Sequence, residues 1–344
     1  MKTQTFLAEK VTIAVPLSFF LRTFAPMNYR LDYQTVCFGP AVRKDCVATV
    51  GMFDGVHTGH QFVAGHVCRR ARERGLLPAV VTFHQPPRQV LQPGWHPQLL
   101  CSPEEKLALL RQTGIGCCFV LAFSRDMAAL SAYDFMRLMR DKMHVRVLLT
   151  GYDNRFGHRC NESFEDYARY GHELGIEVES LPPAPAGEDG CRASSSHVRQ
   201  LLCEGHVGEA ARCLGRYYTL AGTVVSGEHI GRQLGFPTAN LRPDCADQLV
   251  PAAGAYAVRV RIEGVNELLE GMTNIGTRPT FDGQQTTLET HIFGFSGNVY
   301  GRRINISFIA RLRDEHPFSS AEALTTQLRQ DAAKAMNILS THKT

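Results

Sequence analysis

The 344-residue sequence lacks the sequence patterns of several common protein classes. Its eleven cysteines include no C-x-x-C pair and are odd in number, which argues against a zinc ribbon and against a complete disulfide framework. Neither G-x-x-x-x-G-K-[ST] nor G-x-G-x-x-G is present, so a P-loop kinase and a Rossmann dehydrogenase are poorly supported. The net charge is only +4 and no basic run occurs, so nothing in the sequence indicates a nucleic-acid partner.

The sequence also has no apolar run that would span a membrane. Residues 11–21 are largely apolar and follow two lysines, as in an export signal, but Arg22 ends the run short of the roughly 20 residues that a membrane helix needs. We interpret residues 1–27 as an N-terminal extension, either unstructured or lying before a true start at Met27. Scattered free thiols favour a reducing, cytoplasmic location.

Strands and helices alternate in the first part of the chain. Strands are predicted at residues 47–51, 79–83, 117–121, 145–150 and 176–180, and the intervening helices at residues 103–112, 132–143 and 162–174, with a first helix that ends at Arg74. This order predicts an α/β domain, residues 28–217, with a doubly wound parallel sheet and ligands at the carboxyl ends of its strands. Gly51, Phe83 and Gly151 fall at such ends.

Short strands dominate the rest of the chain. They are predicted at residues 219–225, 255–262, 268–273, 288–293 and 304–309, which suggests a closed antiparallel barrel in a second domain, residues 218–344. A short helix at residues 207–213 precedes the boundary. A final helix is predicted to begin with Ser319 as its cap and to end near Met336.

Residues 231–240 carry the most specific motif of the second domain. Gly231 and Gly235 allow close approach of the backbone to a phosphate, and Pro237 stiffens the segment that presents Thr238 and Asn240. Two small oxygen ligands held in this way suit Mg²⁺ beside substrate phosphates. The decapeptide resembles the G-R-x-L-G-F-P-T-A-N signature of riboflavin kinases.

A second motif follows the first predicted strand of the α/β domain. Residues 51–60 read G-M-F-D-G-V-H-T-G-H, a tight loop between a strand and a helix start, where free backbone N–H groups bind phosphate. His57 and His60 share one face of the first helical turn. No cysteine or carboxylate at a matching short spacing completes a zinc site. The segment resembles the H-x-G-H motif of nucleotidylyltransferases, which implies that both imidazoles bind ATP phosphates and stabilise the departing pyrophosphate.

Both motifs, in this order, resemble the bifunctional prokaryotic riboflavin kinase/FAD synthetase family. Further segments resemble the family at residues 151–157, 194–199, 274–281 and 288–293. The resemblance implies a nucleotidylyltransferase-like α/β domain followed by a six-stranded riboflavin kinase barrel with a C-terminal helix. It also implies ATP, riboflavin, FMN and FAD as substrates and products, with Mg²⁺.

The resemblance also implies roles for individual residues. Glu289 would orient the ribityl 5′-hydroxyl and accept its proton, although a strand carboxylate is more often simply solvated. Ser195, Ser196 and Arg199 would bind ATP in the α/β domain. The remaining expected ATP- or phosphate-binding residues of that domain are Gly51, Phe53, Asp54 and Gly59; those expected to bind ATP or flavin in the barrel are Gly231, Arg232, Gly235, Pro237, Asn274, Thr277 and Arg278.

One departure from the family pattern leaves an alternative open. Pro86 stands where the family usually has a polar side chain at the ATP site, and His84 lies two residues earlier. We therefore expect slower adenylyl transfer, with partial compensation by His84. The alternative is a riboflavin kinase whose N-terminal domain is catalytically weak or only binds flavin or nucleotide. A nucleotidylyltransferase for another phosphorylated metabolite is a more distant possibility, because the barrel motifs count against it.

Overall fold

The structure is a computed structural model in which the chain divides into a first unit, Met1–Arg30, and a second, Leu31–Thr344. It describes residues 33–38, 44–151, 156–158, 161–187, 192–227, 231, 234–280 and 283–342, and only the backbone of residues 278–280 and 283–285. The predicted extension, residues 1–27, lies outside the described residues. All elements below belong to the second unit.

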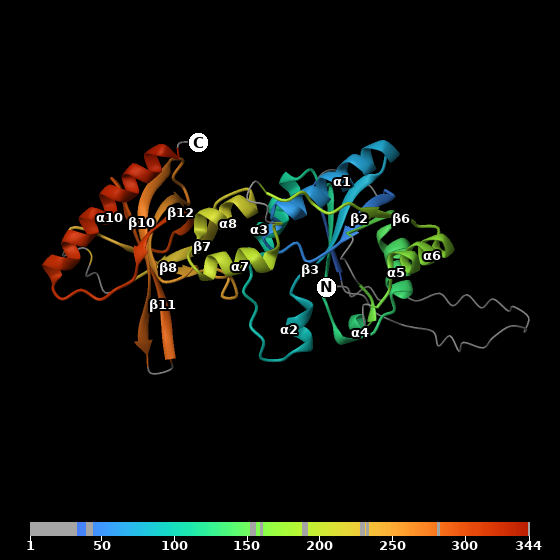
Figure 1. Ribbon diagram of the computed structural model, residues 1–344, viewed down its shortest axis with the longest axis horizontal. Helices are drawn as coiled ribbons and strands as arrows, with labels where there is room; N and C mark the ends of the chain where they lie inside the picture. The colour runs from blue at the N-terminus through green and yellow to red at the C-terminus, as the bar shows by residue number, and fades with distance from the viewer. Residues whose placement is uncertain are drawn as a thin grey trace, which may run out of the picture. The chain divides into compact units, whose positions relative to one another are not determined.

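A six-stranded sheet forms the first domain (Figure 1). Its strand order is β1-β4-β3-β2-β5-β6, and all neighbours are parallel except β1 and β4. The strands are β1 (Tyr33–Cys37), β2 (Cys46–Val50), β3 (Leu77–Phe83), β4 (Cys117–Leu121), β5 (Val145–Gly151) and β6 (Glu177–Leu181). The predicted doubly wound sheet is confirmed, and the antiparallel edge strand β1 is an addition to it.

Helices cover both faces of this sheet. α1 (Thr58–Arg74) and α3 (Pro103–Gln112) cover one face, and α5 (Ala132–Met143) and α6 (Phe164–Leu174) cover the other. The short helices α2 (Pro87–Leu91) and α4 (Arg125–Ala128) contribute no buried residue. Successive strand residues point to opposite faces. Cys118 accordingly joins a core under α1 and α3, whereas Cys117 joins a core under α5 and α6.

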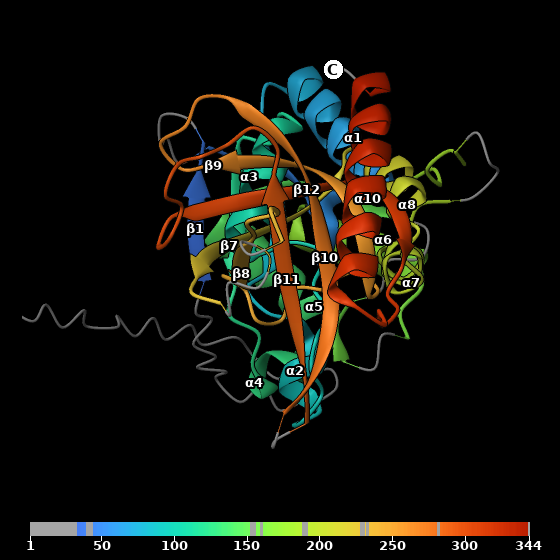
Figure 2. The same cartoon turned by 90° about the vertical axis from the view of Figure 1, so that its left-hand side faces the viewer.

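A closed barrel forms the second domain, with strand order β10-β11-β8-β7-β12-β9 (Figure 2). The strands are β7 (Tyr218–Val225), β8 (Ala239–Pro243), β9 (Gly254–Ile262), β10 (Leu268–Thr280), β11 (Gly283–Ile292) and β12 (Arg303–Asp314), and α10 (Ala321–Thr341) packs against β9, β10 and β12. β8 is absent from the strands predicted above. The helix cap is Ser320, which accepts a hydrogen bond from the Ala323 N–H, so the prediction of Ser319 was wrong by one residue.

Two short helices, α7 (Ser195–Cys203) and α8 (Val207–Leu214), connect the sheet to the barrel. Leu202 and Leu214 of these helices belong to the same buried cluster as Tyr218 and Phe308 of the barrel. The Leu99 N–H donates to the Asp247 carbonyl, which joins a loop of the first domain to a loop of the second. The two domains are therefore packed together and not merely tethered.

Candidate active sites

The H-x-G-H loop connects β2 to α1 through a strained turn. Phe53 and Val56 adopt positive φ angles of 51° and 39°, a backbone conformation that residues other than glycine rarely adopt. Gly55 also has a positive φ, and a Cβ there would lie 2.8 Å from Leu100 Cβ. Residues held in such conformations need strong support from their surroundings and often mark functional sites.

The two histidines of this loop lie against each other. Their ring centroids are 3.7 Å apart in a stacked arrangement, and Phe53 packs on His60. Burial, helped by the charges of Arg216 and Arg199, lowers the pKa of His57 to about 4, and burial also lowers the pKa of His60. Both Nδ1 atoms are buried and lack a hydrogen-bond partner within the described part of the chain. Neutral imidazoles with uncommitted nitrogens can bind an incoming phosphate through an N–H.

Asp54 is the centre of a buried network. Its carboxylate lies 2.6 Å from Arg199 Nη2 and accepts from the Leu100 N–H at 2.9 Å. Burial raises the pKa of Asp54, and Arg199 opposes that rise. Ser195 Oγ donates to the Asp54 carbonyl at 3.0 Å. Ser195 and Arg199 thus contact the loop through Asp54, and their binding of ATP stays a prediction. Ser196, the next residue of α7, is exposed.

Three further residues support the loop and were not identified from the sequence. Arg216 Nη1 donates to the Gly55 carbonyl at 2.8 Å, and Gln61 Nε2 donates to the Val56 carbonyl at 2.9 Å. Lys106 is buried and donates to the Met52 carbonyl of the loop at 3.5 Å and to the Phe83 carbonyl at the end of β3 at 2.7 Å. A lysine on the apolar face of the predicted helix at residues 103–112 is the signal that could have revealed Lys106.

An apolar cavity of about 530 Å³ opens at the carboxyl end of β2 and β3. Its wall includes Gly51, Phe83, Pro87, Phe123, Met127 and Phe156. Pro86 immediately precedes α2, and His84 is exposed and not among the lining residues. Compensation by His84 therefore stays a prediction.

Gly59 approaches the segment that leads into α7. A Cβ at Gly59 would lie 3.2 Å from the Ala193 carbonyl oxygen, which is tighter than most such contacts. Because glycine has no side chain, Gly59 allows the H-x-G-H loop and the segment that leads into α7 to pack closely.

In the barrel, strand pairing brings the kinase motif residues together. Asn240 of β8 is the register partner of Glu289 on β11, and Glu289 in turn is opposite Asn274 on β10. Thr238, just before β8, lines the same cavity as Glu289. A Cβ at Gly227 would press on the side-chain amide of Asn240, so glycine here leaves that amide in its present position.

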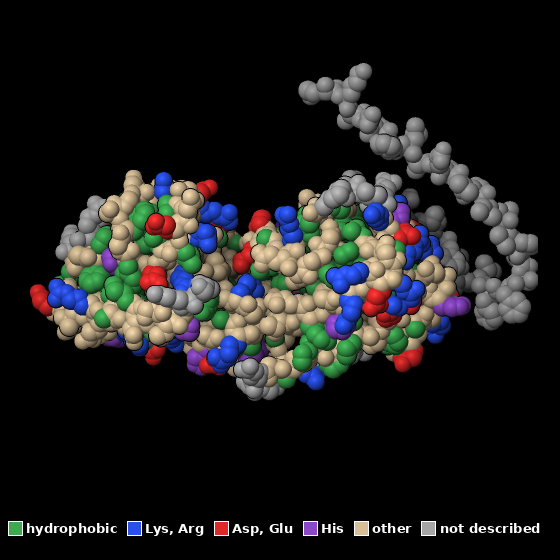
Figure 3. Space-filling model, turned by 90° about the horizontal axis from the view of Figure 1, so that it is seen from above, with side chains coloured by type: hydrophobic (Ala, Val, Ile, Leu, Met, Phe, Trp, Pro, Cys, Tyr) green, Lys and Arg blue, Asp and Glu red, His purple; other side chains and the backbone are tan. Residues whose placement is uncertain are grey.

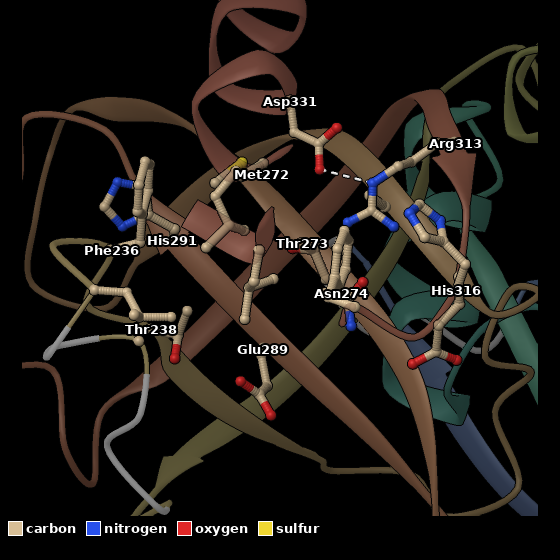
Figure 4. Close-up of a pocket in the computed structure, with 17 residues that line it drawn as sticks. Phe236, Thr238, Met272, Thr273, Asn274, Glu289, His291, Arg313, His316 and Asp331 are labelled. Atoms are coloured by element: carbon tan, nitrogen blue, oxygen red, sulfur yellow. Dashed lines mark hydrogen bonds and ion pairs between the residues drawn. The ribbon is translucent and has the colours of Figure 1, made fainter. Parts of the chain in front are cut away.

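Glu289 faces a cavity of about 280 Å³ (Figure 4). Thr238, Asn274 and Met272 line it with Glu289, and Leu324 and Leu328 of α10 add apolar wall. Arg313 Nε donates to Asp331 Oδ2 at 2.9 Å at one side, next to His316. The cavity thus combines apolar surface with a few charged groups, as small-molecule sites do.

A second cavity of about 380 Å³ adjoins the same motif. Pro237, Thr238 and Ala239 line it together with residues 295–300. Thr238 therefore contributes to the walls of both cavities.

The other predicted barrel residues are less centrally placed. Gly235 has a positive φ of 81°, and Thr277 is exposed and lines neither cavity. Arg232 lies outside the described residues, as does the side chain of Arg278.

On the face shown in Figure 3, Lys and Arg side chains are interspersed with Asp and Glu. The described residues on that face therefore present no continuous basic surface of the kind that binds a phosphate backbone. Among the described residues, no helix is both long and apolar enough to cross a bilayer.

An α/β sheet with an H-x-G-H loop, followed by a barrel with a cavity beside a Pro-Thr-Ala-Asn segment, defines a two-domain enzyme class that uses ATP. Family models agree: FAD synthetase matches residues 39–197, and riboflavin kinase matches residues 214–339. The chain belongs to the bifunctional riboflavin kinase/FMN adenylyltransferase family.

Individual relatives cover nearly the whole chain. The bifunctional riboflavin kinase/FMN adenylyltransferase of Pseudomonas fluorescens is 37% identical over 310 residues, covering 87% of this chain and 96% of the relative. The Escherichia coli K12 protein of the same name is 35% identical, covering 86% and 93%. A crystal structure from Streptococcus pneumoniae, described as a macrolide-efflux protein, is 32% identical with a TM-score of 0.79 and covers 88% and 96% of the two chains.

Proposed function

We infer that the chain converts flavins in two ATP-dependent steps. The barrel phosphorylates riboflavin to FMN and releases ADP, and the α/β domain adenylylates FMN to FAD and releases pyrophosphate. The family supports both activities. Because both steps consume ATP, we propose that the protein works in the cytoplasm. We also propose that the boundary between the two domains lies after Tyr217, where β7 begins.

The observation that carries the kinase assignment is the position of Thr238 between two cavities with Glu289 in one of them. The cavity with Glu289 and the apolar wall of α10 suits the flavin, and the neighbouring cavity suits the nucleotide. The transferred phosphoryl group would then pass close to Thr238. Glu289 orients the 5′-hydroxyl of the ribityl chain and accepts its proton as the oxygen attacks the γ-phosphorus.

The residues around Thr238 fit a bound magnesium ion. Thr238 and Asn240 offer two neutral oxygen ligands on one side of the segment, and at Gly227 and Gly231 a Cβ would press on these residues or on the Phe236 carbonyl. We propose that these two side chains hold Mg²⁺ with ATP. When bound, the ion would offset the negative charge of the phosphates.

For the second step we propose that the H-x-G-H loop binds the ATP phosphates. An FMN phosphate oxygen attacks the α-phosphorus, and the bond to pyrophosphate breaks. The stacked imidazoles and the loop N–H groups stabilise the negative charge on the leaving group. The apolar cavity bounded by Phe83, Phe123 and Phe156 would receive the flavin ring.

One experiment separates the two sites. The protein is incubated with riboflavin and Mg-ATP, or with FMN and Mg-ATP, and FMN and FAD are resolved by chromatography. Asn240→Ala should abolish FMN formation while FAD formation from supplied FMN persists. Asn305→Ala on β12, whose strand partners are Ala221 and Arg261 and not Glu289, is the matched control and should change neither product. Equal loss of both activities in Asn240→Ala would contradict separate sites.

A further inference from the structure

A cavity of about 530 Å³ lies at the opposite end of the sheet from the H-x-G-H loop. Cys37 of β1 and Cys117 of β4 line it where β4 begins, and Lys44, Lys142 and Asp141 also contribute to its wall. The cavity shares no lining residue with those around Glu289 or Phe83. It is therefore separate from both proposed flavin sites.

The two thiols of this cavity already meet the geometric needs of a disulfide. Cys37 and Cys117 are direct register partners across the antiparallel pair, and their sulfurs are 3.4 Å apart. Cα atoms of such partners lie about 4.5–5.5 Å apart, within the range of about 4.4–6.8 Å that disulfides span. Bond formation needs the sulfurs to approach to about 2.05 Å, which side-chain rotation can supply without backbone movement.

The two thiols differ in access, which assigns them different roles. Cys37 is exposed, whereas Cys117 is 1% exposed. Burial, and the hydrogen bond from Cys37, raise the pKa of Cys117. Cys37 is therefore the sulfur that an external reagent reaches first, and Cys117 can react only with a sulfur already seated beside it.

The charges of the cavity define the reagent. Two lysines, Lys44 and Lys142, outnumber the one carboxylate, Asp141, so an anionic molecule is favoured. We propose that Cys37 and Cys117 form an oxidation site for anionic low-molecular-weight disulfides of the glutathione type, and that the reaction closes a cross-strand disulfide between β1 and β4.

The reaction balances as two thiol–disulfide exchanges. The Cys37 thiolate attacks one sulfur of the reagent, whose S–S bond breaks, and one thiol leaves with a proton from solvent. The Cys117 thiol then loses its proton to solvent and attacks the Cys37 sulfur, and the second thiol leaves. The protein loses two electrons and two protons, and the reagent is reduced to two thiols.

The expected consequence is a covalent link that fixes the edge strand. The bond closes a loop from Cys37 to Cys117 that contains β2, α1 and β3, and such a link reduces the freedom of the unfolded chain. We expect the unfolding midpoint of the oxidised protein to rise, while both flavin reactions stay within about twofold of their reduced rates because neither site is touched.

The test uses the full chain with oxidised glutathione, intact mass measurement and peptide mapping after alkylation without reduction. Wild type should lose two hydrogen masses and yield a linked Cys37–Cys117 peptide. Cys117→Ser should instead retain one glutathione on Cys37, and Cys37→Ser should give neither product. Cys203→Ser removes another exposed thiol and should leave the linked peptide unchanged.

Circular dichroism shows whether each variant is folded. If a variant does not fold, peptide mapping of the oxidised wild type still decides whether the Cys37–Cys117 link forms. A linked peptide in Cys37→Ser, or glutathione on Cys203 without any Cys37–Cys117 link in wild type, would overturn the proposal.

Discussion

The H-x-G-H loop and the cavity around Glu289 are built in different ways. Around the loop, side chains bond to the loop itself: Arg199 binds Asp54, and Arg216 binds the Gly55 carbonyl. Around the kinase cavity, Thr238 and Glu289 line the space in which the flavin would lie. The first site depends on the conformation of a strained turn, and the second on Glu289 of β11 together with Thr238 just before β8. Substitutions around the H-x-G-H loop should therefore lower activity by changing the conformation of the loop. Substitutions at the cavity around Glu289 should lower it by removing a group that takes part in the reaction.

The largest expected effect is a separation of the two activities. Glu289→Gln keeps the shape of the side chain and removes the base, so FMN formation should fall by about 10²–10⁴-fold with little change in riboflavin affinity. His60→Gln should lower FAD formation from FMN by about 10²–10³-fold. Steady-state rates with each flavin measure both changes.

Controls for this separation come from the same domains. Glu270→Gln on β10 removes a carboxylate that lines neither barrel cavity and should leave both rates unchanged. If Glu289→Gln turned over riboflavin at the wild-type rate, Glu289 would be only a strand carboxylate.

The second prediction concerns the Asp54–Arg199 pair. Arg199→Met leaves a carboxylate that is 4% exposed without its cation. Removing one partner of a buried pair costs about 3–5 kcal/mol, and the partial exposure of Arg199 reduces this to about 2 kcal/mol. Urea unfolding should show this loss, and FAD formation should fall with it.

The double variant Asp54→Asn/Arg199→Met distinguishes support from chemistry. It removes both charges, so much of the stability should return. FAD formation should stay low if Arg199 also binds phosphate. Full recovery of FAD formation would show that Arg199 acts only through Asp54.

The regular elements of the first domain follow closely from local sequence. Residues 103–112 form a helix with the predicted bounds because Ser102 accepts from the Glu105 N–H and Pro103 occupies the first turn. The alternation of strands and helices likewise led directly to the parallel sheet. Such signals lie within a few residues of one another.

What the sequence did not reveal depends on distant pairing. Ala239–Pro243 has little strand character of its own and becomes β8 because it pairs with β7 and β11. Asp54 and Arg199 are 145 residues apart, and both were assigned to phosphate because nothing local indicated that they bind each other. Motif residues could be predicted as a set, but not the bonds among them.

The third prediction is a pH dependence of stability that arises from His57 in the H-x-G-H loop. The folded-state pKa of His57 is about 4, below its ordinary value of 6.5, so between these values the unfolded state binds a proton that the folded state does not. The free energy of unfolding should therefore fall as the pH drops from 6.5 toward 4. At pH 5 the loss from this one group is about 2 kcal/mol.

Denaturant unfolding between pH 5 and pH 8 measures this slope. His57→Gln should reduce it, and the lowered pKa of His60 should leave a remainder of the same sign. A slope that is identical in wild type and His57→Gln would show that this imidazole titrates normally in the folded protein.

The smallest effect is expected at Arg216, which lies between the two domains. Its guanidinium holds the Gly55 carbonyl at 2.8 Å and lies 3.8 Å from Glu105, so Arg216→Met should lower kcat/KM for FAD formation by about tenfold through loss of loop geometry. Arg212→Met, an exposed arginine of α8, is the control and should have no effect.

If Arg216 only held the loop in place, its substitution would lower kcat/KM and leave the pKa of His57 unchanged. The charge of Arg216, however, also helps to lower the pKa of His57. In Arg216→Met the pKa of His57 should therefore rise toward its ordinary value, whereas Arg216→Lys, which keeps the charge, should leave it low. NMR titration of the imidazole measures this difference. If both variants lose activity and the pKa of His57 changes in neither, Arg216 positions the loop without changing the pKa of His57. The H-x-G-H loop would then depend on Arg216 for its conformation alone.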